Sequence, residues 1–109
     1  MYNEEKRMIF YILDENHEPV PATLLEGAAF FESLEKRRVA YHESGKKRAS
    51  TVFLGMDHNF FEDGPPILFE TMTWPDEEQE RYSTYTEALA GHERHCKRMG
   101  IPMHQEELT

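Results

Sequence analysis

The chain has 109 residues, 39% of them hydrophobic, and a formal net charge of −9. Such a length and composition predict one globular domain with its core over about residues 8–100 and flexible ends at 1–6 and 101–109. The negative charge argues against general nucleic-acid binding, and no apolar run reaches the ~18 residues that a membrane span needs. The mixed charges at the start do not resemble a secretory signal, and the single cysteine, Cys96, excludes an internal disulfide. We therefore expect a cytoplasmic protein.

The first third of the chain predicts a strand followed by a helix. Residues 8–13 are a β-favouring run that ends before a proline-rich turn. Thr23 followed by Glu26 is a capping-box pattern, because each residue can satisfy a free backbone amide of the other. Apolar residues then recur at helical spacing, which predicts an amphipathic helix over 24–35.

Three further strands are predicted in the middle of the chain. Residues 38–43 and 50–56 have strand character and are joined by a turn at Gly45. Residues 67–74 form the fourth strand, which Pro75 ends because proline cannot donate to a sheet ladder.

The last element is a second helix. Thr84 and Glu87 form another capping box, and Gly100 is a typical helix terminator. Its buried stripe is expected to hold Tyr85, Ala88, Leu89, His92, Cys96 and Met99. The order β-α-β-β-β-α predicts an α+β fold, with one mainly antiparallel four-stranded sheet and both helices packed on one face.

The central strand–loop–strand unit has an acidic residue, Glu70, inside an apolar strand. A carboxylate facing the core would cost several kcal/mol unless it were paired, so we expect Glu70 to face away from the helices. The predicted core face then holds Val52, Leu54, Met56, Ile67 and Phe69. The outer face would hold Thr51, Phe53, Gly55, Asp57, Glu70, Met72 and Trp74, with a gap at Gly55 bounded by Phe53, Asp57, Glu70 and Trp74.

Two interpretations of these carboxylates stay open. In one, Asp57, His58 and Glu70 form the active site of a small hydrolase, because neighbouring carboxylates can divide acid and base roles. In the other, Asp57 bonds the backbone of its own loop and Glu70 pairs with Arg38 or Arg81. Other catalytic motifs are absent from the sequence.

A metal site is a further alternative. His92, His95 and Cys96 have i, i+3, i+4 spacing on the last helix, and His58 could add a ligand, which gives His58, His92 and Cys96 as candidate zinc ligands. The competing interpretation is that His92, beside Gly91, is a core histidine bonded to backbone where helix and sheet approach closely. We favour the core histidine and expect no cofactor.

Several segments together resemble a family of small proteins encoded by tailed phages and prophages. They are residues 50–60 (STVFLGMDHNF), 64–72 (GPPILFETM), 81–84 (RYST), 87–88 and 91–92, and the likeness extends over about 19–96. The loop differs, because the family has glycines where this chain has Phe60, Phe61 and Glu62. The resemblance implies a phage origin and action in the cytoplasm of the infected host, and it supplies no catalytic residues.

The leading hypothesis is a non-catalytic phage accessory protein that binds a host-side target. A small anionic ligand, such as a nucleotide-like immune signal in an anti-defence role, would contact Arg38, Phe53, Asp57, His58, Glu70, Trp74, Arg81 and Tyr82. A host or phage protein would instead dock on the adjacent aromatics Phe60 and Phe61. The alternatives are the hydrolase, an inhibitor of a host protein, and a structural homodimer or larger homo-oligomer.

Overall fold

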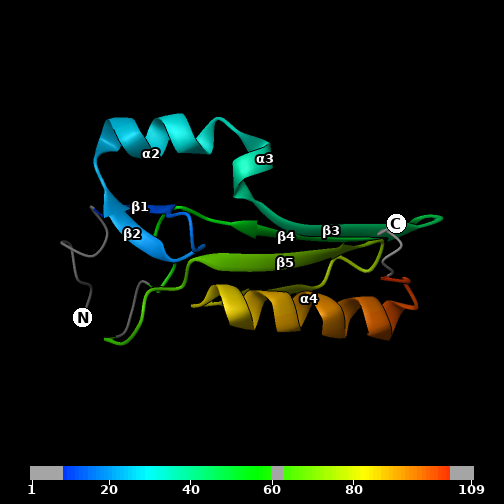
Figure 1. The fold of residues 1–109 in the computed structure, drawn as a ribbon. Coiled ribbons are helices and arrows are strands. Elements are labelled where there is room, and N and C mark those ends of the chain that lie inside the picture. The colour runs from blue at the N-terminus through cyan, green and yellow to red at the C-terminus, as the bar shows by residue number, and fades with distance from the viewer. Residues whose placement is uncertain (1–8, 60–62, 104–109) are drawn as a thin grey trace.

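The computed structural model describes residues 9–59 and 63–103, which form an α+β fold with two antiparallel sheets (Figure 1). A small sheet pairs β1 (Phe10–Leu13) with β2 (Pro19–Ala22). The main sheet has the order β3 (Arg38–Ser44), β4 (Lys47–Phe53), β5 (Phe69–Trp74) and β6 (Gln79–Tyr82). The helices are α2 (Leu24–Phe31), α3 (Leu34–Arg37) and α4 (Tyr85–Met99). No helix within the described ranges is long and apolar enough to cross a bilayer.

The arrangement differs from the expected single sheet in two respects. The strand at residues 10–13 pairs with β2. Its backbone is joined to the central unit by a bridge from Phe10 to Met56 and by the Tyr11 N–H, which donates to the Gly55 carbonyl, and Leu13 packs against the core cluster. The fourth strand of the main sheet is β6, whose Gln-Glu-Arg-Tyr sequence has no apolar pattern to reveal it.

The two long helices also do not share one face. Helix α4 contacts all four strands of the main sheet, whereas α2 packs on β1, β2 and α3. Figure 1 shows α4 beneath the main sheet and α2 above it. One face of the main sheet is therefore covered by α4.

Both predicted capping boxes are confirmed. Thr23 with Glu26 caps α2, and Thr84 with Glu87 caps α4. Helix α2 ends earlier than expected, at Phe31, because the Ser33 side chain accepts the Lys36 N–H and starts a separate short helix. Helix α4 ends at Gly100, whose φ of 72° is the left-handed conformation expected of a terminating glycine.

The register of β4 against β5 confirms one half of the prediction and contradicts the other. Glu70 lies opposite Val52, on the face away from α4, as expected. However, Thr51 and Phe53 are completely buried on the core face, and Val52 is only half-buried on the outer one. The prediction that Thr51 and Phe53 face outward and Val52 faces the core was therefore wrong. It relied on hydrophobicity alone, which places valine inside and threonine outside.

Threonines occupy this core because their hydroxyls bond one another. Thr51, Thr71 and Thr73 are all fully buried. The Thr51 and Thr71 hydroxyl oxygens are 2.5 Å apart, and the Tyr82 hydroxyl donates to Thr71 at 2.9 Å. A buried hydroxyl with a partner loses little on leaving water, so a β-branched polar residue fits a buried strand.

Helix α4 approaches the sheet most closely at Gly91. A Cβ built on Gly91 would overlap the Tyr82 hydroxyl and ring, so no larger residue fits without displacing the helix. This glycine sets the distance at which the neighbouring His92 enters the core.

We expect Gly91→Ala to destabilise the protein by about 2 kcal/mol, because overpacking costs about 1–3 kcal/mol and outweighs the gain in helix propensity. Urea unfolding followed by circular dichroism measures this. The matched control is the exposed neighbour Ala90, where Ala90→Gly should cost only about 1 kcal/mol from propensity. A Gly91→Ala protein as stable as the wild type would contradict the close approach.

Candidate functional site

The residues expected to bind a ligand lie on two different faces of the main sheet. Phe53 and Tyr82 are buried in the core that also includes Ala88 of α4. Glu70 and Trp74 lie on the outer face, where Arg81 pairs with Glu70. The sheet itself therefore separates most of the two groups, although Arg81 and Tyr82, which are adjacent on β6, both line a polar pocket beside Glu80 and Arg94.

The carboxylates of the hydrolase hypothesis each have a local structural partner. Asp57 Oδ1 accepts the Asn59 and Ile67 amides at 2.8 Å, and Glu70 Oε2 accepts Arg81 Nε–H at 3.0 Å. These are the backbone bonds and the arginine pairing proposed as the alternative to catalysis. Ile67, whose amide Asp57 accepts, precedes Glu70 by three positions, which is about 10 Å along a strand.

His58, the third residue of that hypothesis, also bonds locally. Its Nδ1 lies 2.9 Å from the Met56 carbonyl oxygen, in the loop that follows β4. Asp57 and His58 thus bond the backbone of their own loop, and Glu70 pairs with an arginine of the neighbouring strand. Phe60 and Phe61, the expected protein-binding pair, lie outside the described residues.

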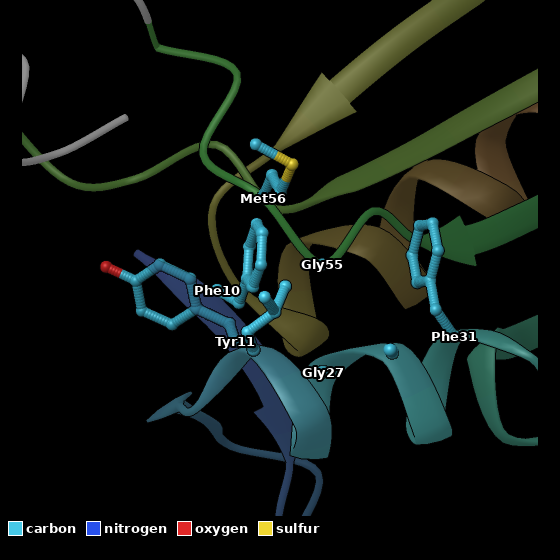
Figure 2. A pocket seen from close by; sticks show the side chains of 8 residues that line it. Phe10, Tyr11, Gly27, Phe31, Gly55 and Met56 are labelled. Carbon is cyan, nitrogen blue, oxygen red and sulfur yellow. The ribbon is translucent and has the colours of Figure 1, made fainter. Parts of the chain in front are cut away.

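A pocket does lie at Gly55, but none of the residues expected to bound it, Phe53, Asp57, Glu70 and Trp74, lines it. It is an apolar pocket of about 200 Å³ between α2, β1 and the segment after β4, and Figure 2 shows the rings of Phe10 and Phe31 on either side of Gly55. The residues that line it are Phe10, Tyr11, Leu24, Gly27, Ala28, Phe31, Gly55 and Met56.

Two glycines give the pocket its shape. Gly55 has φ +82°, and a Cβ there would come within 2.8 Å of the Phe31 ring. A Cβ on Gly27 would come within 3.1 Å of the Phe10 side chain. The small adjacent residues Gly27 and Ala28 on α2 are the feature of the sequence that indicates this pocket.

The pocket opens through an apolar rim. Leu24 is 66% exposed, Phe31 45% and Met56 38%. Burial raises the pKa of the Tyr11 phenol above its ordinary value, with a further contribution from the Asp57 carboxylate. The Tyr11 hydroxyl therefore stays neutral, and the pocket carries almost no polar surface.

The outer face of the main sheet has a different character, because arginines stack on its aromatic rings. The Arg48 guanidinium carbon lies 4.7 Å from the centre of the Trp74 ring, and Arg38 lies 4.7 Å from that of Tyr41. Such cation–π contacts hold both partners in place while leaving the guanidinium charge at the surface.

A chain of buried polar groups lies between the main sheet and α4. His92 Nδ1 is 2.7 Å from Thr51 Oγ1, and His92 Nε2 is 2.9 Å from His42 Nδ1. His92 is 1% exposed, which confirms the expected core histidine, although its partners are side chains and not backbone. His42 was missed because it comes from β3, far from the helical spacing that drew attention to His92.

The surroundings keep His92 and the adjacent cysteine uncharged. Burial lowers the pKa of His92 to about 4, and nearby His42 and His95 add to the effect. Burial likewise raises the pKa of the Cys96 thiol, with a smaller contribution from Glu93. Both groups are therefore neutral at pH 7.

Comparison with known proteins adds no assignment. No family model, curated protein or solved structure matches the chain significantly. The resemblance to small phage proteins stays a prediction.

The depressed pKa of His92 predicts a pH-dependent stability. Histidine in the unfolded chain has its ordinary pKa of 6.5, whereas His92 in the folded protein has a pKa of about 4. Between pH 6.5 and about pH 4, the unfolded chain therefore binds a proton that the folded protein does not, so stability falls as the pH drops. We expect the free energy of unfolding to decrease by about 1–2 kcal/mol from pH 7 to pH 5. Urea titrations at several pH values measure this.

His92→Asn provides the control, because its amide can still bond Thr51 but does not titrate. The stability of His92→Asn should therefore change little between pH 7 and pH 5. If the free energy of unfolding falls with pH equally in the wild type and in His92→Asn, a group other than His92 causes the pH dependence.

Proposed function

We propose that this protein is a non-catalytic binding module that captures an apolar side chain of a partner protein in the pocket at Gly55. The observation that carries the proposal is the open apolar cavity surrounded by exposed Leu24, Phe31 and Met56. Exposed apolar surface of this kind is a feature of protein-interaction sites.

The size of the pocket favours one anchoring side chain over a large ligand. Small-molecule sites usually occupy about 300–1,000 Å³. A dry apolar cavity of about 150 Å³ is enough to hold benzene. A pocket of about 200 Å³ therefore suits a single phenylalanine or leucine side chain.

The surface around the opening extends the apolar contact. Leu25 is 81% exposed on α2 and Leu34 is 48% exposed on α3. Arg37 stacks on Phe31 at 4.5 Å and donates to its carbonyl oxygen at 3.0 Å. Arginine and aromatic residues around an apolar pocket are typical of interface hot spots.

The resemblance to phage proteins supports a target in the infected host. A host protein whose function is blocked by this contact fits the apolar pocket and its exposed rim. A second copy of the chain is the alternative occupant, and it corresponds to the homodimer.

Peptides selected from a random displayed library on the wild-type protein should contain a phenylalanine, leucine or tryptophan that is essential for binding. Ala28→Trp fills the opening, so it should weaken these peptides at least tenfold in fluorescence-polarisation titrations. Leu25→Ser is the matched control on the same helix, because Leu25 does not line the pocket, and it should have a small effect.

Selected peptides that bind Ala28→Trp as tightly as the wild type would contradict the proposal. Light scattering distinguishes the homodimer. A wild-type dimer that Ala28→Trp converts to a monomer would identify a second copy as the occupant.

The outer sheet face supports a second candidate, a nucleotide-like anionic ligand. Arg48 and Trp74 present a cation beside an aromatic ring, and Arg81 lies on the same face. Guanidinium groups bind phosphate strongly, and half-exposed Trp74 can stack on a base. Phe53 and Tyr82 take no part in this version, because both are in the core.

Trp74→Ala and Arg48→Ala should each weaken binding of cyclic or linear nucleotides at least tenfold by calorimetry, if the protein sequesters them. Arg94→Ala is the control, because Arg94 pairs with Glu80 on the side covered by α4. A bound nucleotide recovered unchanged after heat denaturation supports sequestration, and an altered one supports catalysis. Nucleotide affinity that is unchanged in Trp74→Ala and Arg48→Ala would exclude the outer sheet face as the binding site.

A further inference from the structure

Three residues with metal-binding side chains converge where β3 meets α4. His42, His92 and Cys96 each offer a ligand atom, and these atoms all lie within 4.8 Å of one another. Cys96 is fully buried, His92 is 1% exposed and His42 is half-buried. The cluster is separate from the pocket at Gly55 and from the outer sheet face.

The fold brings these side chains together through features that are independent of one another. His92 and Cys96 are four residues apart on α4, so they lie one above the other on the same helix face. His42 pairs with Ala49 on the adjacent strand, and Ala49 belongs to the same buried cluster as Cys96. Gly91 allows the helix to come close enough for His92 to reach His42.

His92 is already oriented as a metal ligand would be. Its Nδ1 lies 2.7 Å from the Thr51 hydroxyl, and its Nε2 points at His42 Nδ1. A histidine ligand usually donates its second ring N–H to a fixed oxygen, which holds the ring and directs the other nitrogen to the metal. Thr51 is such an oxygen, and it is held in turn by Thr71.

The coordinating forms of the two side chains are neutral imidazole and thiolate. The Cys96 thiol would release its proton to solvent when a sulfur–metal bond forms, so metal binding should strengthen as the pH rises.

We propose that His42, His92 and Cys96 bind a transition-metal ion of the Zn²⁺ class. Imidazole and thiolate are the ligands that zinc prefers, and three protein ligands with water in the fourth position make a common zinc site. Two nitrogens bound tetrahedrally at about 2.1 Å lie about 3.4 Å apart. The His42–His92 separation of 2.9 Å needs to open by only a few tenths of an ångström.

Such an ion would join the edge strand β3 to the last turns of α4. His42 is the ligand from the sheet, and the other two come from the helix. This set differs from the one expected from the sequence, because His42 takes the place of His58.

The test uses the full chain after removal of metal with a chelator. Free Zn²⁺ at 100 times its dissociation constant should raise the melting temperature by about 10 °C or more, since it adds roughly 2.7 kcal/mol to the free energy of unfolding. Co²⁺ should give an absorption band from sulfur-to-cobalt charge transfer, which reports the Cys96 bond directly.

Cys96→Ala should abolish the cobalt–sulfur band, and His42→Gln should weaken Zn²⁺ binding at least tenfold. His42 is half-buried at the sheet edge, so its variant tests the site even if the Cys96 variant does not fold. His58→Gln is the matched control and should behave as the wild type. No thermal shift and no cobalt–sulfur band in the wild type would overturn the proposal, as would unchanged binding in His42→Gln.

Discussion

The hydrogen-bond chain between the main sheet and α4 is the constraint on which the rest of the structure depends. It runs from His42 through His92 and Thr51 to Thr71 and Tyr82, among side chains that are almost all buried. A buried polar group left without a partner costs about 1–3 kcal/mol, so small displacements of α4 that break several bonds are strongly disfavoured. This hydrogen-bond chain therefore fixes α4 in one position on the main sheet. Purely apolar contacts, which are not directional, would allow α4 to shift along the sheet more easily.

The two faces of the main sheet follow from this arrangement. Because the polar chain and Phe53 occupy the side beneath α4, the other side carries Glu70, Trp74 and the stacked arginines. The apolar pocket arises elsewhere, where α2 crosses the segment at Gly55 and the side chains of the described residues leave a space. The protein thus offers a pocket for an apolar anchor and a separate cationic–aromatic face, while His92 and Cys96 lie inside.

The sequence was most informative where a local rule applied. Features that depend on neighbouring residues were predictable, and these are both capping boxes, the turn at Gly45 and the helix end at Gly100. The outward position of Glu70 was also predictable, because it depends on the cost of one buried charge. The predictions failed where tertiary partners decide. Thr51 is inside only because Thr71 and His92 satisfy its hydroxyl, and β6 exists only because β5 offers it a paired edge. His42 joins the cluster through sheet pairing, which no spacing within α4 could reveal.

A double-mutant cycle on Thr51 and Thr71 tests the central claim most directly. Thr51→Val, Thr71→Val and the double variant keep the shape of the core, and urea unfolding gives the free energy of each. If the buried chain acts as one unit, the single losses will not add, and the coupling energy will be at least 1 kcal/mol. Additivity to within about 0.3–0.5 kcal/mol would contradict the account, because it would mean that the two hydroxyls stabilise the fold independently.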